Sequence, residues 1–192
     1  MKRALQRAIL VVALFVAGTP AVSAESIDSG DRLANPLFAF ATNAPEGVLR
    51  ELGYSPIEHL AVTVDLDDEP AYPVDLKDNI RKLAGPDAVF WVLVKGSRDT
   101  TQDERAVAVI RDLAAVAAES GVRTAIYPHQ GNYLTTAREA LRLVKQVNQP
   151  NVGLTLALFH ELAGDQEPNL PQIIDEVAPH LFVVTISGTD RK

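Results

Sequence analysis

The chain has 192 residues, and its 25 acidic and 18 basic side chains leave a net charge of −7. Hydrophobic residues make up 47% of the chain, which excludes a disordered protein and is typical of a globular domain. An acidic chain without a block of Lys and Arg lacks the electrostatic footprint of nucleic-acid binding, so we expect no nucleic-acid partner. The absence of Cys excludes disulfides, thiolate metal sites and cysteine nucleophiles.

The first 24 residues are typical of a signal peptide. Basic residues precede an apolar run at residues 8–17, and Pro20 follows the run. Residues 22–24 (VSA) match a small-x-small cleavage site, which predicts a cut before Glu25. The run is shorter than the roughly 20 residues that span a bilayer; an uncleaved anchor is the alternative. We expect an exported bacterial protein, periplasmic or secreted, without stable membrane insertion after cleavage.

The rest of the chain alternates between strand-like and helix-like segments. Residues 25–34 are polar and aperiodic, which predicts a flexible tether before a single domain at residues 35–192. Strands are expected at residues 36–42, 57–60, 61–65, 88–94, 122–127, 152–159 and 181–186. Helices are expected at residues 45–53, 75–83, 101–120, 136–148 and 169–178. Thr136 and Glu139 form a capping box at the start of the fourth helix.

The spacing of the strands predicts the fold class. The last four strands begin about 30 residues apart, the length of one βα unit. Residues 88–94 are apolar on both faces, which is typical of a parallel sheet covered on both sides. We therefore expect an α/β fold with six or seven parallel strands. A complete (β/α)8 barrel needs about 250 residues, so the alternatives are an open doubly wound sheet and a barrel that lacks a piece.

Ligands of both architectures bind at the carboxyl ends of the strands. The polar residues at the predicted ends are Glu58, His59, Lys95, Tyr127, His129, His160, Glu161 and residues 185–191. His129 and His160 follow neighbouring strands, so they can act as metal ligands or as a proton-transfer pair; the alternative is two rim histidines bonded to backbone. Glu58 is either a base or a solvated acid. Lys95 is either an anion holder or an ordinary surface lysine.

Other motifs with known chemistry do not occur. The sequence holds no P-loop, GxGxxG, HExxH or GxSxG pattern. Trp91 lies inside the apolar strand at 88–94, so we expect it to pack in the core rather than to serve as a sugar-stacking platform.

Four segments together resemble the xylose isomerase-like TIM barrels, the sugar phosphate isomerase/epimerase family. They are ELGYSPIEH (residues 51–59), RDLAAVAAESGVRTAIYPHQGN (111–132), REALRLVKQVNQPNVGLTLALFH (138–160) and HLFVVTISGTDR (180–191). The segments follow one another in the family's order. The resemblance implies a partial (β/α)8 TIM barrel, because the strand that carries the family's last Glu falls beyond Lys192.

The resemblance also bears on cofactor and site. Members hold a divalent metal such as Mn²⁺ or Mg²⁺ with a Glu, an Asp, a His and a final Glu, and they move a proton on a sugar. In this chain the first three positions fall on Tyr127, Ala157 and Thr185, so the resemblance leaves the cofactor open and assigns no metal ligand. The residues that remain for catalysis are His129, His160 and Glu58, and those for substrate binding are Arg191, Tyr127 and Lys95.

These observations favour a sugar (phosphate) isomerase/epimerase-like protein that acts on or binds a sugar-like polyol, with the usual metal ligands replaced. The alternative is a non-catalytic, exported carbohydrate-binding or interaction module, since three ligand positions are lost together. An incomplete barrel exposes strand edges, which makes homo-oligomers possible and leaves a gene fragment as a third alternative.

Overall fold

The computed structural model describes residues 9–13, 37–39, 59–83, 88–98 and 100–187. The predicted tether at residues 25–34 and the predicted helix at 45–53 lie outside these ranges.

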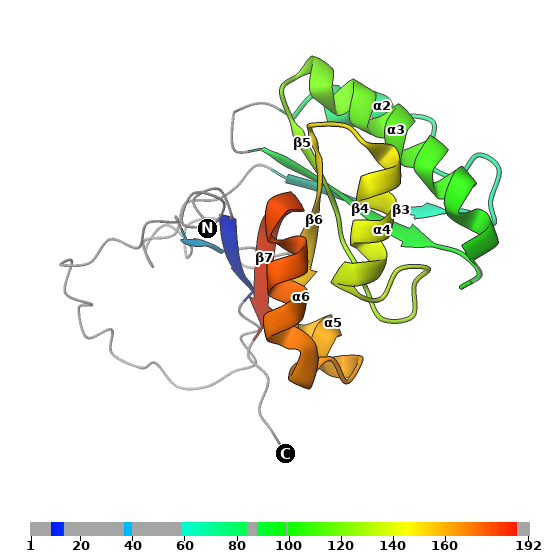
Figure 1. Cartoon of the computed structure of the whole chain (residues 1–192). Coiled ribbons are helices and arrows are strands. Elements are labelled where there is room, and N and C mark those ends of the chain that lie inside the picture. Colours follow the sequence, from blue (N-terminus) through cyan, green and yellow to red (C-terminus); the bar gives the residue numbers. More distant parts are fainter. Residues whose placement is uncertain (1–8, 14–36, 40–58, 84–87, 99, 188–192) are drawn as a thin grey trace, which may run out of the picture.

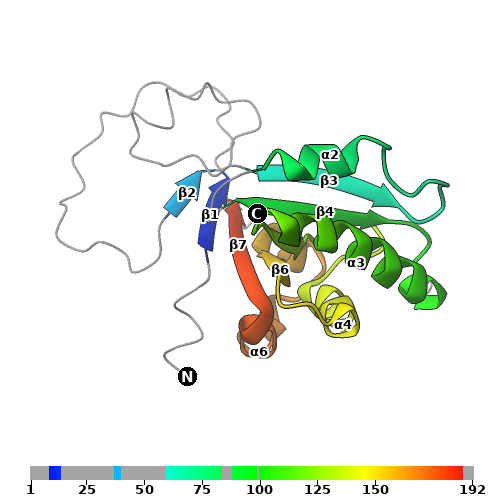
Figure 2. The same ribbon diagram turned by 90° about the horizontal axis from the view of Figure 1, so that it is seen from above.

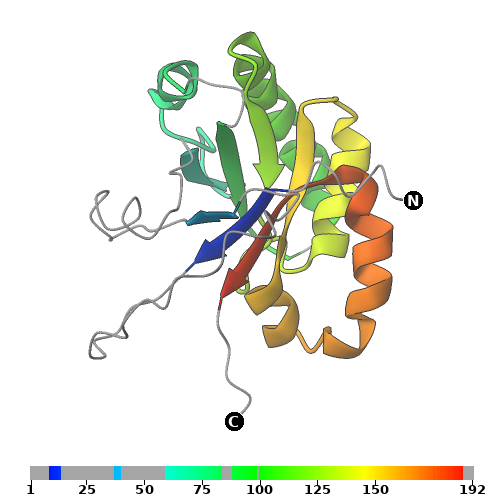
Figure 3. The same cartoon turned by 90° about the vertical axis from the view of Figure 1, so that its left-hand side faces the viewer.

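Within the described ranges, seven strands form one parallel sheet. They are β1 (Ile9–Ala13), β2 (Leu37–Ala39), β3 (His59–Asp65), β4 (Val89–Lys95), β5 (Arg123–Ile126), β6 (Val152–Ala157) and β7 (Leu181–Ser187). Their spatial order is β2-β1-β7-β6-β5-β4-β3, and Figure 3 shows β1 and β7 side by side. This is the circular order of a barrel opened between β2 and β3, whereas a doubly wound sheet reverses its order midway. The predicted α/β fold and partial TIM barrel are therefore confirmed, and the barrel is not closed.

Helices cover the outer face of the sheet. The covering helices are α2 (Leu76–Arg81), α3 (Asp103–Glu119), α4 (Ala137–Val147) and α6 (Leu170–Val177), while α5 (Leu158–Ala163) follows directly on β6 at its carboxyl end. Figures 1 and 2 show α3, α4 and α6 in a row beside the strands. Phe90, Ile110, Leu143 and Ile173 are fully buried in the layer between helices and sheet. Burial of this apolar layer is the main stabilising contribution to the fold.

Across the described ranges, no helix combines the length and apolarity that crossing a membrane requires.

The inner face of the sheet has a smaller core of its own. Val89, Trp91, Ala125 and Val183 form a buried cluster there. The Trp91 Nε1–H donates a hydrogen bond to Thr155 Oγ1 at 3.0 Å, which satisfies the buried indole. The prediction that Trp91 packs in the core is confirmed.

Two sequence predictions about strand ends are wrong. Residues 57–60 and 61–65 were expected as two strands, but His59–Asp65 is one strand, paired continuously with β4 from His59↔Val89 to Asp65↔Lys95. Val89 begins β4, so His59 lies at the amino edge of the sheet, opposite the edge where ligands bind. Glu58 itself lies outside the described residues. The strand expected at 152–159 ends at Ala157, because Leu158 already begins α5.

Strand β1 lies inside the predicted signal peptide. It pairs with β7 from Ile9↔Val183 to Ala13↔Ser187. A short apolar run suits both a leader and a buried strand, so cleavage before Glu25 stays a prediction. N-terminal sequencing of the exported protein tests it.

The predicted capping box of α4 is confirmed. The Thr136 hydroxyl accepts a hydrogen bond from the Glu139 backbone N–H, and the Glu139 carboxylate accepts one from the Thr136 backbone N–H. Asn148 ends the helix in the left-handed conformation, at φ 50°.

Gly153 lets β6 approach the start of β7. A Cβ at this position would lie 2.6 Å from the His180 carbonyl oxygen and 2.7 Å from the Phe182 ring. Gly153→Ala is therefore expected to lower the free energy of unfolding by about 1–3 kcal/mol, as overpacking does. Urea denaturation measures the loss, and an unchanged midpoint would contradict this account of the contact.

Candidate functional site

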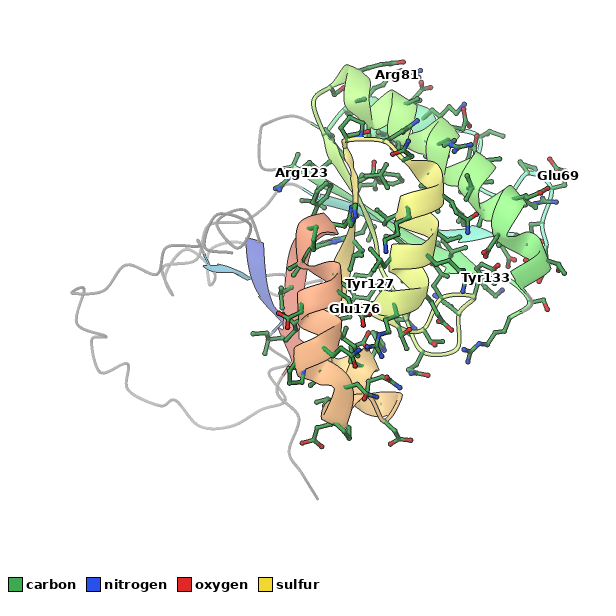
Figure 4. The ribbon with its side chains drawn as sticks, viewed as in Figure 1. Glu69, Arg81, Arg123, Tyr127, Tyr133 and Glu176 are labelled. Carbon is green, nitrogen blue, oxygen red and sulfur yellow. The ribbon has the colours of Figure 1, made fainter. Side chains whose placement is uncertain are left out.

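The candidate site lies at the carboxyl edge of β5 and β6. Tyr127 follows the last residue of β5, and Figure 4 labels it together with Arg123, which begins that strand. His160 lies in α5, directly after β6. Because β5 and β6 are parallel neighbours, with Ile126 paired to Leu154, their carboxyl ends bring the two following segments together.

Two of the predicted residues, His129 and His160, contact each other directly. Their ring centroids are 4.1 Å apart, and the ring planes are tilted by 47°. The Tyr127 and Phe159 rings stand edge-on to His160, at centroid distances of 6.0 and 5.2 Å. The predicted pair of histidines is thus assembled in an aromatic cluster.

His160 is held in its neutral form. Its side chain is buried, with 6% exposed. Burial lowers the pKa of His160 to about 4, and the neighbouring His129 adds to the effect by repelling a second positive charge. At neutral pH the ring can therefore donate or accept a hydrogen bond but carries no charge.

Gln130 joins the two histidines, and the sequence analysis did not single it out. Its carbonyl oxygen lies 2.7 Å from His129 Nδ1, and its backbone N–H donates to His160 Nδ1 at 3.3 Å. Its side-chain amide donates to the His160 carbonyl oxygen at 3.2 Å. A glutamine beside a histidine in a loop carries no recognisable pattern, so only the folded chain shows this role.

Glu161 is a buried acid beside the histidine pair. Its side chain is fully buried, and its Oε1 accepts a hydrogen bond at 2.6 Å from the backbone N–H of Ala137, the first residue of α4. No hydrogen-bond partner of Oε2 is found within the described part of the chain. Burial raises the pKa of Glu161. The carboxyl group ties α5 to the start of α4 and so supports the segment that carries His160.

Lys95 is engaged elsewhere. It ends β4, and its Nζ forms an ion pair with Asp65 Oδ2 at 2.8 Å. This pair joins the carboxyl ends of β3 and β4. The predicted contacts of Glu58 and Arg191 lie outside the described residues.

The three positions that the sequence resemblance predicts for metal ligands do not fit a divalent ion. The Tyr127 hydroxyl lies 3.5 Å from Thr185 Oγ1, and Ala157, at the second of the three positions, offers only a buried methyl group. A phenol, a hydroxyl and a methyl group are poor ligands for Mn²⁺ or Mg²⁺, which prefer carboxylates. Nowhere in the described ranges do three His, Asp or Glu side chains gather as metal ligands. These three positions therefore do not form a site for a divalent metal.

The sequence model of a family described as "Xylose isomerase-like TIM barrel" matches residues 50–192. The chain belongs to this family. No curated protein matches the chain in sequence.

Solved structures of two epimerases and an AP endonuclease resemble this chain. The 3-keto-D-glucoside 4-epimerase from E. coli, without ligand, superposes with a TM-score of 0.55 at 15% identity, over 72% of this chain and 60% of that one. D-psicose 3-epimerase in the presence of D-fructose gives 0.44 at 17% identity, over 72% and 64%. An AP endonuclease, family 2, from Brucella melitensis gives 0.42 at 15% identity, over 78% and 81%. The chain spans less than two thirds of the two epimerases, and the first of these likenesses shows the fold.

Proposed function

We propose that this protein is a sugar isomerase/epimerase-like protein that binds a sugar-like polyol through His129 and His160, without a metal ion. Membership of the xylose isomerase-like family supports a small sugar as the ligand. The likeness to the E. coli epimerase agrees with this choice of ligand class. The observation that carries the proposal is the contact of the two imidazole rings, 4.1 Å apart, at the edge where such barrels bind their ligands.

The histidine pair has the chemistry for proton transfer next to a carbonyl group. The lone pair of one imidazole nitrogen takes the proton from a carbon that bears a hydroxyl group. The electrons of the broken C–H bond form the C=C bond of an enediolate, and the carbonyl oxygen takes up negative charge. An N–H of the other ring stabilises that oxygen by a hydrogen bond. The protonated ring then gives the proton to the former carbonyl carbon while the hydroxyl proton moves to the charged oxygen, which completes the isomerisation.

The neutral state of His160 suits the second of these tasks. A neutral imidazole can donate a hydrogen bond to an oxygen. Because it carries no charge, it does not oppose the uptake of a proton by the neighbouring His129. The low pKa of His160, about 4, keeps it neutral throughout the physiological range.

His160→Ala is expected to abolish sugar binding, because it removes one of the two rings and the partner of the other. The measurement is isothermal titration calorimetry with D-fructose and D-psicose against the full chain. His180→Ala is the matched control, since His180 precedes β7 at the opposite edge of the sheet. Unchanged affinity in His160→Ala, or equal losses in both variants, would contradict the proposal.

Turnover separates the proposal from the non-catalytic alternative. The replacement of the metal-ligand positions by Tyr127, Ala157 and Thr185 is the observation that favours a binding module. Ketose conversion in the presence of EDTA supports an enzyme, whereas binding without conversion of any ketose or aldose supports the module. We also propose that the protein is periplasmic or secreted, as the predicted signal peptide indicates.

A further inference from the structure

Both backbone groups of Gln130 bond to histidine rings, and each fixes where a proton sits. A carbonyl oxygen only accepts hydrogen bonds, so His129 Nδ1, 2.7 Å from the Gln130 oxygen, carries the hydrogen. A backbone N–H only donates, so His160 Nδ1 offers its lone pair to it. In neutral imidazoles the second nitrogen has the opposite state. His129 therefore has a lone pair on Nε2, and His160 has an N–H on Nε2.

The two Nε2 atoms are free for a ligand. No hydrogen bond joins either atom to another group of the described residues, and neither is a buried atom without a partner. Each Nε2 therefore keeps some exposed surface, even though His160 as a whole is only 6% exposed.

We infer that Gln130 is a positioning residue that sets opposite tautomers on His129 and His160, so that the pair recognises a hydroxyl-bearing carbon next to a carbonyl group. The carbonyl oxygen accepts a hydrogen bond from His160 Nε2–H, and the carbon that bears the hydroxyl group presents its hydrogen to the lone pair of His129 Nε2. The matching ligand class is an uncharged α-hydroxy ketone or aldehyde, such as an open-chain sugar. The inference rests on the proposed function for the identity of the ligand, but the tautomers rest on the contacts alone.

The side chain of Gln130 holds the arrangement in place. Its Nε2 donates to the His160 carbonyl oxygen, which links the loop after β5 to α5. Gly164, at the end of α5, makes room for this amide, because a Cβ there would lie 2.9 Å from Gln130 Nε2. A methyl group at Gly164 displaces the end of a flexible side chain, so the link can be broken without replacing Gln130 itself.

The test is NMR of the full chain with ¹⁵N-labelled histidine at pH 7.5, which distinguishes the two tautomers by the nitrogen shifts. The expected result is one Nδ1–H ring, His129, and one Nε2–H ring, His160, assigned with His→Gln variants. Gln130→Ala and Gly164→Ala are expected to mix the tautomers of His160 and to weaken D-fructose binding about tenfold, the effect of one lost hydrogen bond. Gln166→Ala is the control, since its amide bonds to the Gly164 carbonyl oxygen and not to a histidine residue.

The outcomes separate the two claims. Equal tautomers on both rings of the wild-type protein, or unchanged tautomers in both Gln130→Ala and Gly164→Ala, overturn the positioning role. Equal weakening by Gln166→Ala also overturns it, because the effect then comes from general loosening of α5. Opposite tautomers that depend on Gln130, in a protein that binds no ketose, support the positioning role and contradict the proposed function.

Discussion

Replacing Glu161 by Ala is expected to lower the free energy of unfolding by about 3 kcal/mol. The substitution leaves the backbone N–H of Ala137 buried without its acceptor, which costs about 1–3 kcal/mol, and the lost side-chain atoms leave a cavity. Urea denaturation monitored by the fluorescence of Trp91 measures the change. A variant as stable as the wild type would contradict the role of Glu161 as the link between α5 and α4.

Glu161→Gln is the matched control, because its amide oxygen keeps the acceptor for Ala137 and its NH₂ replaces the unpaired Oε2. Burial raises the pKa of Glu161 above its usual 4.5 in the folded state. The contribution of the protonated group is fully present below the unfolded pKa and is lost as the pH rises through the raised pKa. The Gln variant should therefore be more stable relative to wild type at pH 7 than at pH 4. A pH-independent difference would show that the pKa of Glu161 does not change on folding, and would contradict the effect of its burial.

The contribution of His160 to stability is expected to depend on pH in the opposite way to that of Glu161, so that acidification destabilises the protein. Its pKa is lowered from 6.5 to about 4 in the folded state, so the unfolded chain binds the proton first. Stability is complete above pH 6.5 and falls as the pH drops towards 4, by about 3 kcal/mol at most.

Comparison with His160→Asn isolates this contribution, because Asn keeps an acceptor for the Gln130 N–H and does not titrate. Urea denaturation at pH 7 and at pH 4.5 should show a smaller loss in the Asn variant than in the wild type. Equal losses in the two proteins would show that His160 is not held neutral.

Local patterns predicted the parts of the fold that depend on local contacts. The capping box of Thr136 and Glu139 involves backbone groups three residues apart, so its sequence pattern was sufficient. The apolar run at 88–94 predicted a strand buried on both faces because burial follows directly from composition.

Boundaries and partners that depend on distant contacts were not predictable. Leu158 and Phe159 continue the apolar run of β6, but they belong to α5, whose Glu161 bonds to Ala137 on another helix. No local sequence pattern shows that residues 59–65 form one strand; the pairing with β4 decides it.

The candidate site was predicted only in part, because several of its contacts join residues that are distant in the sequence. The regular spacing of the strands in the sequence predicted that His129 and His160 lie close together, because neighbouring parallel strands end at the same edge of the sheet. It gave no information on Gln130, whose contacts with both rings run mainly through its backbone. Lys95 was placed at the correct edge, but its ion pair with Asp65 depends on the register of β3 and β4.

The most direct test of the account is ketose binding without metal. Thermal melts of the full chain should be recorded with D-fructose or D-psicose, in EDTA and in Mn²⁺, since a ligand that binds the native state raises the melting temperature. The account predicts that the sugar raises the melting temperature equally in EDTA and in Mn²⁺. It also predicts that the sugar has no effect on the melting temperature of His160→Ala, and that Mn²⁺ alone has no effect on the wild type. A sugar shift that requires Mn²⁺ would contradict the central claim that the histidine pair binds the sugar without a metal.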